Sequence, residues 1–143
     1  MVKFFQLIRV GFFVVLTTLS ASVFAGVAED VKAVVEENMT ATQNEDMDRM
    51  MNTIHQQSPS YQATRQQVAP LFQQYDLTYE LNDYEFVGMT GEFAVVKVRQ
   101  TTRKVGGTAA FNNNELELLQ AFKKEGGQWK FWSQSILNMR FFK

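Results

Sequence analysis

The stretch EFAVVKVRQTTRK, residues 92–104, decides the fold, because its side chains alternate between two unlike faces. The drier face carries Ala94, Val96, Val98, Gln100 and Thr102. The opposite face mixes Val95 with Lys97, Arg99 and Thr101. A period of two is the pattern of a β-strand, and a single apolar face predicts a sheet that is covered on that side only.

Three further segments of the same kind flank this one. They are Leu77–Val87, Asn114–Lys124 and Gln128–Phe141. The connections Gly88–Gly91 and Glu125–Gln128 contain the glycines that tight hairpin turns require. The sequence therefore predicts a four-stranded antiparallel sheet, with a longer connection at Val105–Asn113.

The residues before the sheet have helical periodicity. A first helix is predicted over Val27–Gln43, where apolar residues recur every three or four positions. Asn44 then has the position of an N-cap for a second helix. The apolar stripe of this helix consists of Met47, Met50, Met51 and Ile54. We interpret it as core, although methionine stripes also occur on binding surfaces.

A third helix is expected over Tyr61–Tyr75, after the pair Ser58 and Pro59, which is a favoured helix opening. Pro70 lies inside it and lacks a backbone donor, so a kink or break is expected near Gln66–Ala69. Three helices followed by four antiparallel strands predict an α+β domain, with the helices packed on one face of a curved sheet. The 143 residues, 45% of them apolar, suffice for one such domain.

Residues 1–25 have the order of a secretory signal peptide. Lys3 and Arg9 precede the apolar run Val10–Leu19, and small residues lead to Ala25. The run is about half of the roughly 20 residues that a membrane-spanning helix requires, so an anchor is the less favoured interpretation. We therefore expect cleavage after Ala25, export to the periplasm or the medium, and a single mature domain at residues 26–143 without a stable membrane anchor.

Composition excludes several classes of function. The chain has no cysteine, which excludes disulfides, thiolate metal sites and a lipidated cysteine. The single histidine, His55, cannot form a zinc site by itself, and we expect neither a metal nor another cofactor. Beyond the signal, adjacent basic residues occur only at positions 103–104 and 123–124, so nucleic acid is not an expected partner.

The strand sequences resemble those of the nuclear-transport-factor-2-like superfamily, the cystatin-like α+β cone fold of SnoaL-like proteins and ketosteroid isomerases. The resemblance rests on Tyr79–Gly88, on Gly91–Gln100 and on the closing hairpin Phe122–Trp132, FKKEGGQWKFW. It implies a pocket between the helices and the sheet. These motifs are structural, and no position matches the catalytic residues of the isomerases. The segment His55–Ser60 also leaves little room for the extra strand or hairpin that many members have.

The polar residues of the drier face are the candidate ligand site. They are Gln100, Gln120, Ser133 and Ser135, joined by Tyr79 if the first strand points it inward. A buried polar group costs about 1–3 kcal/mol unless it finds a partner. The set therefore either floors a pocket for a small apolar or amphipathic molecule, or its members bond to one another, to water or to a helix end.

His55 and Asp83 are the candidates for catalysis. His55 ends the second helix and is either a general base or a surface cation favoured by the helix dipole. Strict alternation from Tyr79 would point Asp83 inward, where a carboxylate could abstract protons. A bulge near Asn82 would instead turn Tyr84 inward and leave Asp83 in water, and we favour the bulge.

The opposite, mixed face of the sheet is too apolar to lie wholly in water. Its candidate contact residues are Val95, Arg99, Leu119, Trp132 and Ile136. Apolar side chains rimmed by charges suggest an interface, and the outer sheet face is the usual dimer interface of the proteins that this chain resembles. We expect a homodimer; the alternative is a monomer in which lysine and arginine stems shield Trp132.

Together these features predict an exported module that binds a small ligand or a protein without covalent chemistry. One alternative is a SnoaL-type isomerase or hydrolase, in which Asp83 or His55 acts with Tyr79 or Tyr84 as a donor. The other is a structural envelope protein whose dimer surface is its function.

Overall fold

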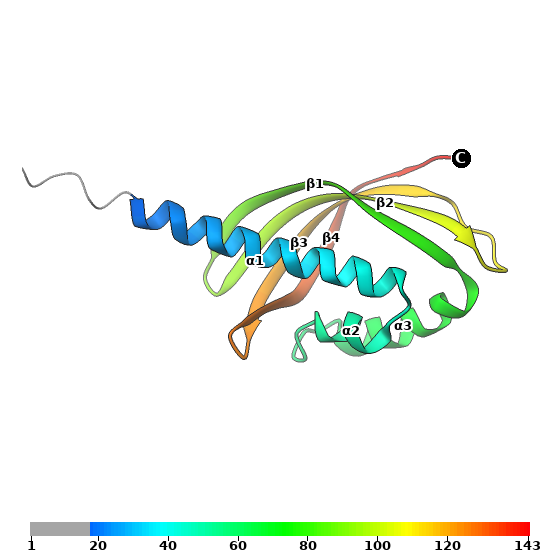
Figure 1. Cartoon of the computed structure of the whole chain (residues 1–143), viewed down its shortest axis with the longest axis horizontal. Coiled ribbons are helices and arrows are strands. Elements are labelled where there is room, and N and C mark those ends of the chain that lie inside the picture. Colours follow the sequence, from blue (N-terminus) through cyan, green and yellow to red (C-terminus); the bar gives the residue numbers. More distant parts are fainter. Residues whose placement is uncertain (1–17) are drawn as a thin grey trace, which may run out of the picture.

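The computed structural model describes residues 18–143, and these form three helices followed by four strands (Figure 1). The helices are α1 (Thr18–Gln43), α2 (Met47–Asn52) and α3 (Tyr61–Gln74). The strands are β1 (Asp76–Thr90), β2 (Phe93–Gly106), β3 (Asn114–Glu125) and β4 (Gln128–Phe141). The predicted order of elements and the α+β class are confirmed.

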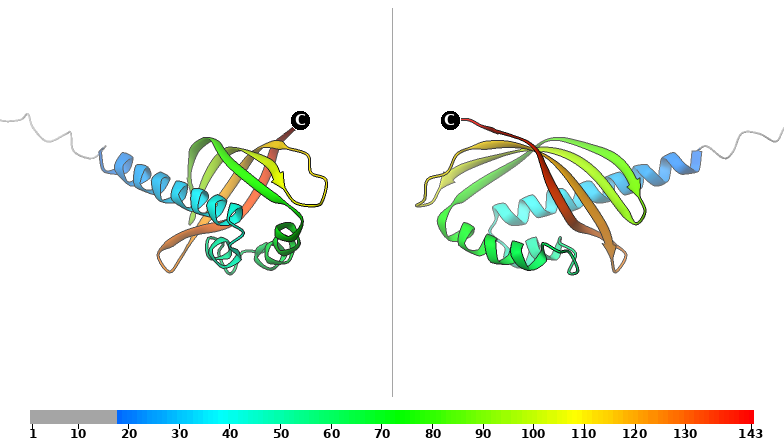
Figure 2. Two further views of the ribbon diagram at one scale, coloured as in Figure 1. Left: turned by 45° about the vertical axis from the view of Figure 1, so that its right-hand side comes forward. Right: turned by 180° about the vertical axis from the view of Figure 1, so that it is seen from behind.

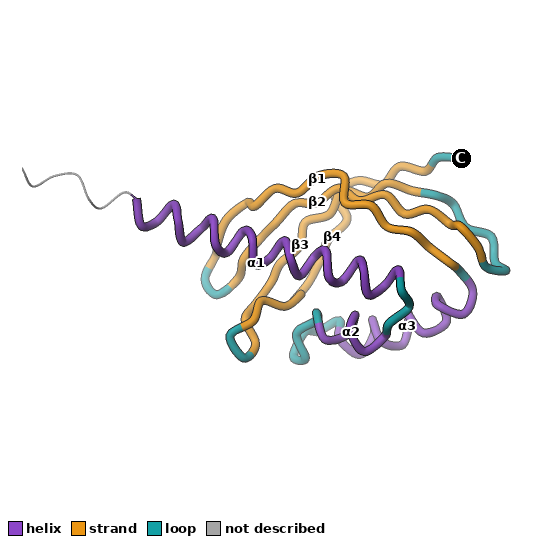
Figure 3. The backbone as a smooth tube through the Cα atoms, viewed as in Figure 1, coloured by secondary structure: helices purple, strands orange, loops and turns teal. Residues whose placement is uncertain are grey.

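The strands form one antiparallel sheet in the order β1-β2-β3-β4, so that each strand pairs with the next along the chain. Figure 3 shows the strands bending together over the helices, with the connections at the two ends of the sheet. Gly91, Gly126 and Gly127 have positive φ in the two short hairpins. Glycine adopts a positive φ at little energetic cost, so glycines at these positions predicted the hairpin turns from the sequence.

The predicted bulge in β1 is confirmed. Leu81 pairs with Gln100 and Asp83 pairs with Arg99, so Asn82 has no opposite residue on β2. The side chain of Asn82 accepts a hydrogen bond of 2.7 Å from the Thr101 hydroxyl. This one-residue shift leaves Asp83 exposed on the outer face of the sheet.

Strand β4 contains two irregularities that the sequence analysis missed. Phe131 pairs with Phe122 and Ser133 with Ala121, so Trp132 is skipped in the register. Further along, Leu137 is skipped between Ile136 and Asn138. Each skipped residue moves the following side chains to the other face of the sheet.

The main core lies between α1 and the concave face of the sheet, and Figure 2 shows α1 running along that face in both views. Helix α1 contributes Val31 and Val35, both at most 1% exposed. The sheet contributes Ala94, Val96, Val98, Leu118, Phe122 and Trp129. Phe122 is fully buried, and its ring lies 4.4 Å from the ring of Phe131. The drier face of β2 is thus the core face, as predicted.

Helix α1 begins earlier than predicted, at Thr18 rather than at Val27. Its first turns project beyond the sheet (Figure 1), and residues 21–26 are exposed. Ala25, the predicted last residue of the signal peptide, lies within this part of the helix. Residues 1–17 of the predicted signal lie outside the described residues.

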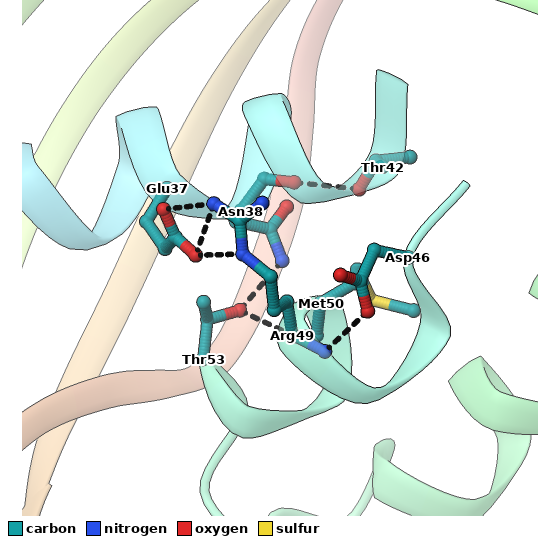
Figure 4. A network of polar contacts seen from close by, with 7 residues as sticks. All are labelled: Glu37, Asn38, Thr42, Asp46, Arg49, Met50 and Thr53. Atoms are coloured by element: carbon teal, nitrogen blue, oxygen red, sulfur yellow. Dashed lines mark hydrogen bonds and ion pairs between the residues drawn. The ribbon is translucent and has the colours of Figure 1, made fainter. Parts of the chain in front are cut away.

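A polar network joins α1 to α2 (Figure 4). Arg49 donates two hydrogen bonds of 2.9 Å to the carboxylate of Glu37, and Asn38 donates one of 2.7 Å to the Thr53 hydroxyl. The N-cap of α2 is Asp46, whose carboxylate accepts from the Arg49 backbone N–H at 3.0 Å. The prediction of Asn44 as the cap was wrong by two positions, because the chain first makes a turn in which Glu45 has a positive φ.

The methionine stripe of α2 is core, as predicted. Met50, Met51 and Ile54 form a second buried cluster with Ala41. A parallel bridge joins Ile54 to Phe131, so the end of this helical unit lies along the outer edge of β4.

Helix α3 is the least buried of the three helices. It begins after Ser60, with Pro59 outside the helix, and none of its residues is fully buried. Of the kink or break predicted near Gln66–Ala69, the break is wrong, since the helix continues through Pro70 to Gln74. The β2–β3 connection packs on its end, where Thr108 donates a hydrogen bond of 3.1 Å to the Gln74 carbonyl.

Candidate functional site

The concave face of the sheet can be followed row by row, because opposite residues of antiparallel strands share a face. One row is Tyr84, Val98, Leu118 and Ile136; the next is Leu81, Gln100, Leu116 and Met139. The row toward the closing hairpin is Phe86, Val96, Gln120 and Gln134. None of these three rows contains a carboxylate or a histidine. Apart from the Tyr84 hydroxyl, these three rows therefore present apolar and amide side chains to the helices.

The helices cover only part of this concave face. Leu118 is 2% exposed, whereas Ile136 beside it in the same row is 57% exposed. Met139 and Phe141 are 43% and 60% exposed. The uncovered area is completed by the half-buried Leu116. We call these four residues the open concave patch.

The five predicted ligand residues do not form one group. Gln100 and Gln120 lie on the concave face as expected, and Tyr79 lies in the row of Thr102. Ser133 and Ser135 pair with Ala121 and Leu119 and lie on the outer face, so their placement beside Gln120 was wrong. The cause is the skipped residue Trp132, which exchanges the two faces of β4.

Gln134 and Ile136 take the places that had been assigned to the serines. The amide nitrogen of Gln120 donates to Gln134 Oε1 at 3.3 Å. Gln120 is 3% exposed, and its Oε1 has no hydrogen-bond partner in the described part of the chain. A pairing of Gln134 with Gln120 has no signal in the sequence of β4 alone, because the register of β3 decides it.

Tyr79 and Tyr84 remain neutral in the fold. Burial raises the pKa of each hydroxyl to about 12. Tyr84 donates a hydrogen bond of 2.7 Å to the Ala28 carbonyl of α1, which commits its proton to a structural bond. Tyr79 lines a hollow of about 310 Å³ together with Gln43 and Arg103, at the end of α1.

Neither catalytic candidate lies on the concave face. Asp83 is exposed on the outer face, beside Arg99. His55 is 4% exposed, which corrects its interpretation as a surface cation. Its ring meets the edge of Trp132 at 5.0 Å, and its Nδ1 accepts from the Gln57 backbone N–H at 3.1 Å.

Glu125 connects His55 to the closing hairpin. Its carboxylate lies 3.5 Å from His55 Nδ1 and 2.8 Å from Lys130 Nζ. It also accepts from the Gln56 backbone N–H at 3.0 Å. The hydrogen bonds from Lys130 and Gln56 hold the pKa of Glu125 below its usual value. This arrangement clamps the hairpin to the segment after α2.

The outer face carries most of the predicted contact residues but not all of them. Val95, Arg99 and Leu119 lie there, whereas Ile136 lies on the concave face and was wrongly assigned. Trp132 is half-buried, with its ring 5.7 Å from that of Phe93 and 4.9 Å from Lys123 Nζ.

The middle of the outer face is a charged hollow of about 310 Å³. Its side chains include Asp83, Lys97, Arg99, Glu115, Glu117 and Arg140. Lys97 pairs with Glu85 at 2.8 Å, and Arg140 pairs with Glu115 at 3.1 Å. The face is thus more polar than its sequence pattern suggested.

Residues 18–143 contain no group of three or more histidine, cysteine or acidic residues that could hold a metal ion. In the same residues, no helix is long and apolar enough to cross a membrane.

Several solved structures share this fold at low sequence identity. An NTF2-like protein from Cytophaga hutchinsonii is 18% identical, with a TM-score of 0.61 over 74% of this chain and 93% of that one. The beta subunit of benzoate 1,2-dioxygenase from Burkholderia mallei is 11% identical, with a TM-score of 0.62 over 76% and 87%. Bd1075 of Bdellovibrio bacteriovorus is 16% identical, with a TM-score of 0.61, and the match covers 76% of this chain but 39% of Bd1075.

Other matches include a protein with a cystatin-like fold. The NTF2-like fold that the sequence resemblance implied is therefore confirmed. Among curated protein sequences, none matches significantly. A family profile matches residues 33–142, which is more than half of the chain. The chain therefore belongs to the family of the C-terminal domain of the anti-sigma-I factor RsgI9.

Proposed function

We propose that this chain is a binding domain without covalent chemistry, and that it holds a small apolar or amphipathic molecule on the open concave patch. The observation that carries the proposal is the composition of the three concave rows, which present apolar and amide side chains with no carboxylate or histidine, and whose one phenol, Tyr84, is bonded to α1. An enzyme that moves protons needs a titratable group within reach of its substrate. A binding surface needs apolar area with a few polar groups that fix orientation.

The exposure of the patch supports this proposal. Ile136 and Phe141 are each more than half exposed, although both extend an otherwise buried face. Burial of apolar area stabilises a complex by about 25 cal/mol per Å². Gln100 and Gln134 lie at the border of the patch and supply donors and acceptors for the polar end of an amphipathic ligand.

The alternative of an isomerase or hydrolase finds less support. It requires Asp83 or His55 to face the substrate, and these lie on the outer face and in the clamp with Glu125. The tyrosines that would donate protons have raised pKa values, and Tyr84 is bonded to α1.

The family supports a regulatory role, since its description is that of a domain of an anti-sigma factor. In that setting the bound molecule acts as the signal, and this domain acts as the sensor. We propose export on the basis of the predicted signal peptide. The test is the intact mass of the protein in the exported fraction, which is expected to equal that of residues 26–143. Recovery of the uncleaved chain in membranes, with no cleaved protein in the exported fraction, would contradict it.

Titration with the amphipathic fluorophore 1-anilinonaphthalene-8-sulfonate tests the ligand site. Ile136→Asp places a charge in the open concave patch and is expected to raise the Kd at least tenfold, which corresponds to about 1.4 kcal/mol. Ser135→Asp is the matched control, because it adds the same charge at the next residue on the outer face. Equal effects of the two variants, or unchanged binding by Ile136→Asp, would refute the proposed site.

A further inference from the structure

Strand β4 has an outer edge that is covered at its start and open along the rest. Its first half is bonded by the segment after α2: His55 N–H donates to the Phe131 carbonyl, and Phe131 N–H donates to the Thr53 carbonyl, both at 2.9 Å. Ser58 Oγ donates to the Trp132 carbonyl at 2.6 Å. From Ser133 to Phe141 every residue is exposed. We call Ser133–Phe141 the open edge.

The other edge of the sheet is protected in the ways that are usual for edge strands. Strand β1 contains three register irregularities, and its acidic side chains include Glu80, Asp83 and Glu85. The Tyr79 backbone N–H is also occupied, since it donates to the side chain of Gln43 at 3.0 Å. Charges, bulges and occupied backbone groups prevent the addition of a foreign strand.

The open edge lacks most of this protection. Its one charged residue is Arg140, which is already paired with Glu115. Its one irregularity is at Leu137, and that residue is itself apolar and 52% exposed. A long edge with exposed apolar side chains and few charges is a template for strand addition.

We propose that the open edge pairs antiparallel with the open edge of a second copy of this chain, which makes one continuous sheet across the two molecules. The sequence of the edge is self-complementary in this arrangement. A two-fold axis between Ile136 and Leu137 places Arg140 opposite Ser133 of the second copy and places the apolar centres against each other. No like charges then face one another across the paired edges.

This interface is distinct from the outer face that the sequence analysis assigned to a dimer. The edge contact uses backbone groups of Ser133–Phe141, whereas the outer-face contact would use side chains around Leu119. The edge contact shares Ile136, Met139 and Phe141 with the open concave patch, but strand addition uses their backbone groups in the plane of the sheet, whereas a ligand would contact their side chains. The two proposals have separate readouts, the dimer Kd and the dye Kd, so failure of one is distinguishable from failure of the other.

Sedimentation equilibrium of the purified protein and three lysine variants tests the pairing. Leu137→Lys is expected to raise the dimer Kd at least tenfold. Val87→Lys is the matched control, because Val87 is the skipped residue of a β1 irregularity and is 56% exposed. Leu119→Lys probes the outer face, where Leu119 is 37% exposed. Both controls are expected to keep the dimer Kd within about twofold of that of the unsubstituted protein. The tenfold rise expected for Leu137→Lys corresponds to about 1.4 kcal/mol of dimerisation free energy.

A monomeric unsubstituted protein, or a dimer that is lost in Leu119→Lys but kept in Leu137→Lys, overturns the proposal. Hydrogen exchange of the unsubstituted protein on both sides of its dimer Kd gives a second readout that needs no substitution. The amides of Ser133–Phe141 that point away from β3 are expected to exchange at least tenfold more slowly in the dimer. Protection of outer-face residues alone, with no change along the open edge, also overturns it.

Discussion

Gln120 offers a sharp test of the core described above, because it is a buried polar residue that is only half satisfied. It is 3% exposed and lies in a row with Val96, whose side chain is fully buried. Its amide nitrogen donates to Gln134 Oε1 at 3.3 Å, and its own Oε1 has no partner among the described residues. We predict that Gln120→Leu stabilises the protein.

The magnitude follows from the two atoms of the amide. A buried acceptor without a partner costs about 1–3 kcal/mol. The bond to Gln134 contributes about 0.5 kcal/mol, the low end for neutral groups, since 3.3 Å is longer than the usual distance. Leucine has a similar volume, and it removes both the cost of the unpaired acceptor and the contribution of the hydrogen bond to Gln134. The free energy of unfolding is therefore expected to rise by about 1 kcal/mol, and the melting temperature by roughly 2–8 °C.

Urea unfolding measures this change as a shift of the midpoint at constant slope. Gln134→Ala completes the test as a double-mutant cycle. Alone it strands the Gln120 amide nitrogen and is expected to cost about 1 kcal/mol; in the Gln120→Leu background it should cost almost nothing. A loss of more than about 1 kcal/mol in Gln120→Leu would show that the reasoning about the unpaired oxygen is mistaken.

Two further predictions concern the clamp and the β2–β3 connection. The pKa of Glu125 lies below its ordinary value of 4.5 in the folded state, so its contribution to stability is present above that value and is lost as the pH falls through the lowered pKa. Glu125→Gln should therefore lower the free energy of unfolding at neutral pH. In acid unfolding curves, the variant should also lose less stability below pH 4.5 than the unsubstituted protein. An unchanged acid unfolding curve would contradict the stabilising bond between Lys130 and Glu125. Gly107→Ala should destabilise by at least about 1 kcal/mol more than Gly91→Ala, because both have positive φ but only at Gly107 would a Cβ collide with the Gln74 carbonyl. Equal urea midpoints for the two variants would refute this.

The strands were predictable because alternation and turn chemistry are local signals. The predicted Leu77–Val87 and Glu92–Lys104 correspond to β1 and β2, and the bulge at Asn82 followed from the need to bury Tyr84. The two irregularities of β4 were not predictable in this way. Trp132 and Leu137 are both apolar, so either face could accept them, and only the register with β3 decides.

The prediction of the candidate site was wrong in part because the register of β4 was not predicted. An error of one residue in β4 placed Ser133 and Ser135 where Gln134 and Ile136 lie, and so predicted a polar floor where the structure has an apolar patch. The burial of His55 was also invisible in the sequence. It depends on Trp132 and Glu125, which come from the closing hairpin.

The clamp between the segment after α2 and the closing hairpin has a consequence for the order of folding. Ser58 and Trp132, which it joins, are separated by 74 residues, and Gln56 and Glu125 by 69. The hairpins of the sheet need far shorter loops, so they are expected to form first and the clamp last. The segment from α2 to His55 is then expected to detach most readily while the sheet stays intact. Its detachment would uncover the start of β4, so that the outer edge of this strand would be open along its whole length.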